Sequence, residues 1–158
     1  MMKYLFSLFL VFSFLVTNAQ IKLLTLNDLG KRLAKGKDTT YVINFWATWC
    51  GPCVEELPHF EKVNKDAAKQ PIKVILVSLD FKSKLKTAVI PFVVKNKLSS
   101  EVYVINEPDQ QVFIEKVDKN WSGAIPATLF VNTHKKVRQF YEKELSYNEL
   151  IETLEKLK

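Results

Sequence analysis

The stretch FWATWCGPC, residues 45–53, holds the only two cysteines of the 158-residue chain, Cys50 and Cys53. The run YVINFW (residues 41–46) is rich in β-branched and aromatic residues, which predicts a strand that leads into the cysteines. Beyond them, apolar residues recur at helical spacing as far as about residue 69, which predicts a helix. The two thiols are therefore expected at the point where a strand passes into a helix.

Two structural roles for this cysteine pair are the weaker interpretations. A disulfide across a four-residue loop stabilises by only about 2 kcal/mol in the chain-entropy model, and a chain of this length can bury a core without it. A structural zinc site needs four ligands, and the remaining candidates, His59 and His134, lie 75 residues apart. Both histidines are explained without a metal, as an exposed helix residue and a turn residue. No metal site is therefore expected.

A redox role makes use of every local feature of the stretch. At the start of a helix, Cys50 lies beside unpaired amide N–H groups and the positive end of the helix dipole, and both stabilise a thiolate. Pro52 has its φ angle preset for a first helical turn. A thiol of pKa about 8.5 is only about 3% thiolate at pH 7, whereas a pKa of about 7 makes half of it reactive. Cys53, one turn along, can then attack a mixed disulfide formed at Cys50.

The same stretch resembles the active-site motif of thioredoxin. With its apolar leader and an additional central segment, the chain resembles the extracytoplasmic TlpA/ResA-like branch of thiol-disulfide oxidoreductases, over about residues 25–158. The resemblance implies an enzyme in which Cys50 attacks the substrate and Cys53 resolves the mixed disulfide. Because Gly51 and Pro52 resemble the reducing members of the family, the implied activity is reduction of protein disulfides.

A second match to the family is GAIPATLFVN, residues 123–132. The resemblance implies that the bond before Pro126 is cis, that Pro126 faces the cysteines, and that the backbone of Ile125 binds the substrate chain. Pro58 corresponds to the helix kink of the family. Trp49 could be a core residue, but beside an exposed nucleophile it is more plausible as an apolar platform for a substrate. The expected substrate-binding residues are Trp49, Gly51, Pro52, Ile125 and Pro126.

Two positions depart from the pattern of the family. Many thioredoxins carry a buried Asp on the strand before the motif, thought to assist the second cysteine; this chain has Asn44 there, which cannot exchange a proton. The extracytoplasmic branch often has an acidic residue after the next strand, and Asp80 lies close to that place. Asp80 is therefore a candidate proton acceptor, with capping of the following helix as the alternative.

Strand and helix patterns alternate along the rest of the chain, which predicts an α/β thioredoxin fold with a mixed central sheet covered on both faces. The lysine-rich residues 82–97 form the central insertion, expected to be a helix that Pro91 breaks or kinks. No linker divides the chain, so one thioredoxin-like domain is expected over residues 20–158. The predicted strands are residues 41–46, 72–79, 101–106, 127–132 and 137–141, and the predicted helices are residues 25–36, 53–69, 82–97, 109–117 and 146–158.

Residues 1–19 have the layout of a signal peptide. Lys3 precedes a continuous apolar run (residues 5–16), and TNAQ offers a cleavage point after Ala19. In a helix this run spans only about 18 Å, short of a hydrocarbon core of roughly 30 Å. Counting everything between Lys3 and Lys22 gives 18 residues, so an uncleaved anchor is the alternative. The protein is therefore expected outside the cytoplasm, in a bacterial periplasm.

Without residues 1–19, the chain carries 22 basic and 17 acidic residues, spread along every segment and interleaved. A nucleic-acid-binding surface would cluster the basic residues on one element, so an ordinary solvated surface is favoured and no nucleic-acid partner is expected. The expected partners are a disulfide-bearing protein substrate and a membrane electron donor, because an extracytoplasmic compartment lacks the cytosolic supply. Membrane contact is expected only if the leader is retained, and no cofactor is expected.

Two other functions are kept as alternatives. The first is a non-catalytic binding module that uses the thioredoxin surface as a scaffold with its cysteines permanently oxidised. The second is a peroxide-reducing enzyme, which would need a lone peroxidatic cysteine framed by Pro and Thr; no such site is visible in the sequence.

Overall fold

The computed structural model describes residues 21–157, and its sheet is built around β2 (Thr40–Trp46) and β3 (Ile72–Ser78). All seven residues of β2 are buried, and the two strands run parallel and in register along their whole length. Because both faces of these strands are covered, they read as almost continuous apolar runs. Both strands occupy the positions predicted from the sequence.

Four further strands complete the sheet: β1 (Lys22–Leu24), β4 (Glu101–Ile105), β5 (Ala127–Asn132) and β6 (Val137–Tyr141). The strand order is β1-β4-β3-β2-β5-β6. Strands β1, β4, β3 and β2 are parallel to one another, while β5 is antiparallel to β2 and β6 is antiparallel to β5. The predicted mixed sheet is therefore confirmed. The sequence analysis did not predict β1, which has only three residues and lies at the edge.

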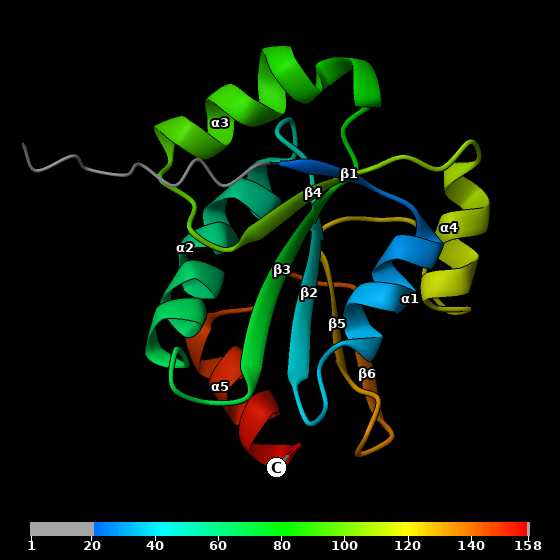
Figure 1. The fold of residues 1–158 in the computed structure, drawn as a ribbon. Coiled ribbons are helices and arrows are strands. Elements are labelled where there is room, and N and C mark those ends of the chain that lie inside the picture. The colour runs from blue at the N-terminus through cyan, green and yellow to red at the C-terminus, as the bar shows by residue number, and fades with distance from the viewer. Residues whose placement is uncertain (1–20, 158) are drawn as a thin grey trace, which may run out of the picture.

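Helices cover both faces of the sheet (Figure 1). On one face lie α2 (Gly51–Asp66) and α5 (Tyr147–Lys156), and on the other lie α1 (Leu26–Ala34) and α4 (Gln110–Val117). Side chains alternate along β2, so that Val42 and Trp46 join the core under α2 and α5, whereas Ile43 and Phe45 join the core under α1 and α4. The predicted α/β thioredoxin fold is confirmed.

The central insertion (residues 82–97) lies between β3 and β4 and is helical over most of its length. It contains a 3₁₀ turn (Lys82–Lys84), a π-helical turn (Leu85–Val89) and α3 (Ile90–Lys95). Pro91 is the second residue of α3, just after the point at which the π-helical turn passes into the α-helix. The backbone stays helical at Val89 and Ile90, so the expected break at Pro91 is a change of helix type and not an interruption. The insertion crosses the end of the sheet at which α2 begins (Figure 1).

Two helices begin at capping boxes. Thr25 and Asp28 form a capping box at the start of α1, and Ser146 and Glu149 form another at the start of α5. Gly36 follows the last turn of α1, where a Cβ atom would overlap the hydroxyl of Tyr41. The expected signal peptide, residues 1–19, and the expected start of the domain at residue 20 lie outside the described residues.

Candidate active site

Cys50 and Cys53 form a disulfide, with an S–S distance of 2.02 Å, at the first turn of α2. Cys50 is the N-cap residue, and the backbone N–H of Cys53 donates a hydrogen bond to its sulfur at 3.3 Å. Cys50 is 7% exposed, whereas Cys53 is 0% exposed. Of the two cysteines, only Cys50 therefore has any exposed surface, and its sulfur lies where the helix dipole and a donated N–H stabilise negative charge.

The loop before β5 closes the site from the other side. The Ile125–Pro126 bond is cis, as the family resemblance implies, and the carbonyl oxygen of Ile125 lies 3.7 Å from the sulfur of Cys50. The approach follows from the sheet, because Phe45 of β2 pairs with Ala127, the first residue of β5. Residues far apart in the sequence therefore meet at one sulfur atom.

Trp49, Gly51 and Pro52 surround the disulfide and are exposed. The side chain of Trp49 is 70% exposed, so it is not the core residue that the sequence allowed as one interpretation. An exposed indole beside a reactive sulfur is an apolar surface that a bound polypeptide can cover.

Asp80 joins two loops at this end of the sheet. Its carboxylate accepts hydrogen bonds from the backbone N–H of Thr48 at 2.9 Å, from the Thr48 hydroxyl at 2.7 Å and from the Ser78 hydroxyl at 2.7 Å. The following 3₁₀ turn has Phe81 as its N-cap and no side-chain cap hydrogen bond. The alternative prediction, that Asp80 caps this helix, is therefore wrong, because its oxygens bind the loop that precedes Cys50.

A buried carboxylate that the sequence analysis did not single out lies on α2. Glu56 is 0% exposed and accepts hydrogen bonds from Asn44 Nδ2 at 2.6 Å and from the backbone N–H of Leu145 at 2.8 Å. Burial raises the pKa of Glu56 to about 7, while the two hydrogen bonds lower it and the charge of Glu144 raises it slightly. Asn44, which cannot exchange a proton itself, therefore holds a carboxyl group that can.

The sequence did contain a signal for Glu56. Cys53, Leu57 and Phe60 mark the apolar face of α2, and all three are buried. Glu56 lies three residues after Cys53 and four before Phe60, so helical spacing puts it on the same face. A charged residue in a buried stripe is uncommon and marks a place to look for a function.

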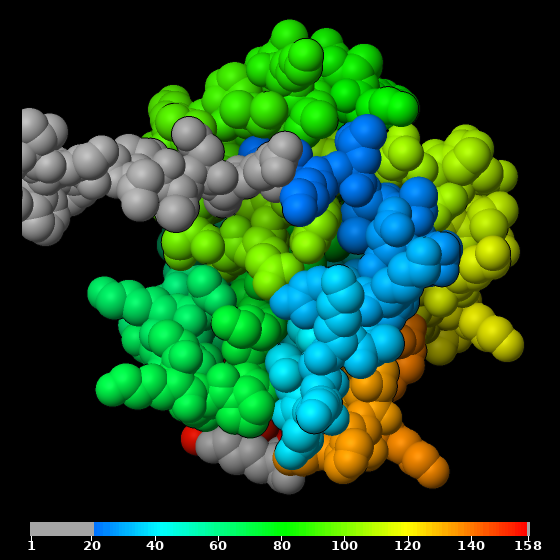
Figure 2. Space-filling view, viewed as in Figure 1, coloured from blue at the N-terminus to red at the C-terminus, as the bar shows by residue number. Residues whose placement is uncertain are grey.

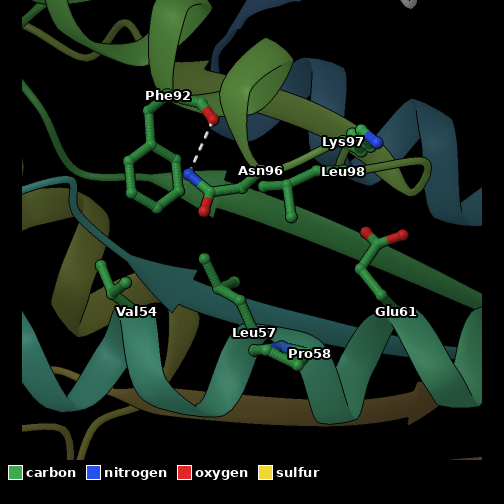
Figure 3. A pocket seen from close by; sticks show the side chains of 8 residues that line it. All are labelled: Val54, Leu57, Pro58, Glu61, Phe92, Asn96, Lys97 and Leu98. Atoms are coloured by element: carbon green, nitrogen blue, oxygen red, sulfur yellow. Dashed lines mark hydrogen bonds between the residues drawn. The ribbon is translucent and has the colours of Figure 1, made fainter.

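A groove of about 260 Å³ lies between α2 and α3 (Figure 3). Val54 and Leu57 line it from α2, and Phe92 lines it from α3, where its carbonyl accepts a hydrogen bond from the Asn96 amide at 2.9 Å. Figure 3 shows these side chains pointing into the space between the two helices. The groove is lined by Val54, Leu57, Pro58, Glu61, Phe92, Asn96, Lys97 and Leu98.

Residues 21–157 contain no group of His, Cys, Asp or Glu side chains arranged to hold a metal ion. Within the same residues, no helix has the length and hydropathy needed to cross a bilayer.

Replacing Glu56 by Gln should remove a pH dependence of stability. Because the pKa of Glu56 is raised from its ordinary 4.5 to about 7, the folded protein binds this proton more tightly than the unfolded chain does. The resulting stabilisation is complete below about pH 4.5 and is lost as the pH rises through 7. Denaturant unfolding of the oxidised protein from pH 5 to 8 should therefore show the wild type losing stability relative to the variant, by about 3 kcal/mol at most.

The control for this experiment is Glu55→Gln, an exposed carboxylate on the same helix. Its stability should follow that of the wild type at every pH. A constant difference between the wild type and Glu56→Gln over this range would mean that Glu56 does not titrate there.

The profile of the AhpC/TSA family matches residues 11–140. The thiol-disulfide oxidoreductase ResA of Geobacillus kaustophilus is 25% identical over 127 residues, which cover 80% of this chain and 68% of that protein. The thioredoxin-like protein YneN of Bacillus subtilis is 38% identical over 63 residues, which cover 40% of this chain and only 35% of YneN.

Solved structures share the fold at low sequence identity. A thioredoxin-related protein from Neisseria meningitidis superposes with a TM-score of 0.68 at 23% identity, covering 79% of this chain and 89% of that one. A secreted disulfide oxidoreductase from Mycobacterium tuberculosis gives a TM-score of 0.59 at 19% identity, covering 78% and 85%. Since the family profile spans most of the sequence, the chain belongs to the AhpC/TSA family, with a thioredoxin-like fold and a cysteine pair of the redox-active CxxC type.

Proposed function

We propose that the protein is an exported reductase of protein disulfides that works through Cys50 and Cys53. The observation that carries the proposal is the asymmetry of the pair: Cys50, at the start of α2, keeps 7% of its surface exposed, and Cys53 is fully buried behind it. Such a pair suits attack by one thiol and resolution by the other. The named function of the ResA relative, thiol-disulfide oxidoreduction, supports the same chemistry.

The reaction begins with both cysteines reduced. The Cys50 thiolate attacks one sulfur of the substrate disulfide, and the other substrate sulfur leaves as a thiolate that takes up a proton. Cys53 then loses its proton and attacks the Cys50 sulfur, which releases the second substrate thiol. Two electrons pass to the substrate, and the enzyme ends with the Cys50–Cys53 disulfide found in the structure. The exposed indole of Trp49, the backbone of Ile125 and the ring of Pro126 hold the substrate chain.

Glu56 is the proton acceptor that this scheme assigns to Cys53. The two residues lie one turn apart on α2 and are both fully buried, so the thiol loses its proton in a site where water is scarce. A carboxyl group with a pKa of about 7 can take up this proton at neutral pH and release it afterwards. Asp80, the first candidate from the sequence, instead has its oxygens committed to Thr48 and Ser78.

The proposal also includes export of the protein and the direction of electron flow. The apolar leader and the secreted proteins among the structural relatives support an extracytoplasmic location. The Gly51-Pro52 pair supports reduction rather than oxidation of substrates. A membrane donor would then return electrons to the Cys50–Cys53 disulfide, since the compartment outside the cytoplasm has no thioredoxin-reducing supply of its own.

The main rival is a binding module with a permanently oxidised pair, and catalytic turnover separates the two. With dithiothreitol as the electron source, the wild type should accelerate reduction of a protein disulfide, and Cys50→Ser should abolish the acceleration. Cys53→Ser should accumulate a mixed disulfide at Cys50, detected by mass spectrometry after acid quench. No acceleration over dithiothreitol alone, together with no trapped mixed disulfide, would favour the binding module.

Glu56→Gln should slow the resolving step more than the attacking step. Removing a general base typically costs about 10²–10⁴ in rate, so the mixed disulfide should persist at least about a hundred times longer at pH 7. Rapid acid quench followed by mass spectrometry measures this lifetime. Asp80→Asn and the control Glu55→Gln should leave the lifetime of the mixed disulfide within about two-fold of the wild-type value, because neither removes the carboxyl group that accepts the proton. A longer lifetime in Asp80→Asn and an unchanged one in Glu56→Gln would transfer the role to Asp80.

A further inference from the structure

Among the described residues, the excess of basic over acidic side chains lies in one segment. The central insertion (residues 82–97) contains five lysines and no acidic residue. The other described residues carry 16 basic and 17 acidic side chains, because Lys3 and Lys158 lie outside the described part of the chain. The even distribution expected from the sequence is therefore wrong, and the whole surplus belongs to this insertion. Its exposed lysines are Lys82, Lys84, Lys86, Lys95 and Lys97.

These lysines have no ion-pair partners in the described part of the chain, where the ion pairs involve other basic residues. Two acidic residues adjoin the insertion, Asp80 just before it in the sequence and Glu61 across the groove that Lys97 also lines, and neither forms an ion pair with an insertion lysine. Asp80 accepts hydrogen bonds from Thr48 and Ser78, and Glu61 accepts them from Ser99 and Ser100. Within residues 21–157, the insertion therefore carries five lysines that form no ion pair.

Exposed apolar side chains gather at the same end of the molecule. Among the described residues, five large apolar side chains are exposed, and four of them belong to this region. Phe81, just before the insertion, is 71% exposed, Val94 in α3 is 68% exposed, and Ile90 is also exposed. The fourth is Trp49, beside the disulfide. Isolated exposed apolar residues are ordinary, but a group beside a reactive centre marks an interaction surface.

The insertion is attached directly to the redox site. Asp80 binds the loop at Thr48 that leads to Cys50, and the ring of Phe92 lies 5.1 Å from that of Trp46, at the end of β2. Figure 1 shows the insertion crossing the end of the sheet at which α2 begins, and Figure 2 shows it as the outermost layer there. A polypeptide held at Cys50 therefore has this surface as its neighbour.

We propose that the central insertion, with Phe81, is a docking surface for an acidic stretch of the polypeptide whose disulfide is exchanged at Cys50. The proposal rests on the proposed function and names its substrate class. Unpaired lysines attract carboxylates across about one Debye length, roughly 8 Å at physiological salt, and the exposed apolar side chains give the bound segment a contact surface. A membrane is the less suitable occupant, because a bilayer covering the insertion would also cover Trp49 and the opening at Cys50.

The test compares two peptides of equal length that contain the same disulfide, one flanked by glutamates and one by lysines. At low ionic strength the wild type should reduce the acidic peptide with a kcat/KM at least about ten-fold higher, because electrostatic steering changes association rates by roughly 10–10³. Added salt should bring the ratio towards one. Replacing Lys82, Lys84 and Lys86 by Glu should reverse the preference, while the rate with a neutral small disulfide stays unchanged.

The matched control replaces Lys37, Lys69 and Lys156 by Glu. These lysines are exposed, and the first two precede the amino ends of β2 and β3, at the opposite end of the sheet from Cys50. The control has the same net charge as the insertion variant and should keep the wild-type preference. A ratio of about one in the wild type, or an equal loss of preference in both triple variants, would overturn the proposal.

Two further measurements separate the other outcomes. A cysteine-free acidic peptide should bind the oxidised wild type more tightly than the oxidised insertion variant, and this result does not depend on catalysis. Failure of the wild type to reduce the neutral disulfide would therefore count against the proposed function alone. If the insertion variant loses binding to vesicles of anionic lipid while its peptide preference is unchanged, the surface binds membranes and the docking proposal is wrong.

Discussion

The hydrogen bond from the Cys53 N–H to the Cys50 sulfur, at 3.3 Å, is the interaction on which the chemistry of this protein depends. It exists because β2 delivers the chain to the start of α2 with Cys50 as the N-cap residue. The first amides of a helix have no carbonyl partners within it, so a sulfur placed there accepts their N–H groups and is stabilised as a thiolate. The parallel sheet holds this turn beside the cis bond before Pro126.

The carboxyl group proposed to accept the proton of Cys53 is held between a strand and a helix. Asn44 on β2 donates to Glu56 on α2, and the N–H of Leu145 donates to the second oxygen of the same carboxyl group. Burial of this carboxyl group away from water raises its pKa to about 7, so the group can exchange a proton near neutral pH. The arrangement gives the buried Cys53 an acidic neighbour on its own helix, while Asp80 fixes the loop on the exposed side.

Much of this architecture could be predicted from the sequence, because it is encoded locally. The apolar runs indicated the strands, the helical spacing of apolar residues after Cys53 indicated α2, and the cysteine motif indicated the redox site. Glu56 was missed because its meaning depends on the burial of one helix face and on Leu145, 89 residues away. The roles of Asp80 and of the insertion lysines likewise depend on which loops the fold brings together, which spacing along the chain does not reveal.

The direction of electron flow decides whether the Cys50–Cys53 pair reduces or oxidises its substrates. The reduction potential of the Cys50–Cys53 pair, measured by equilibrating the protein in dithiothreitol buffers and counting alkylated thiols by mass spectrometry, tests the proposed direction most directly. A reductase of protein disulfides should have a potential close to that of thioredoxin, about −270 mV. A value near about −120 mV, typical of a strong oxidant, would contradict the account and make the protein a donor of disulfides instead.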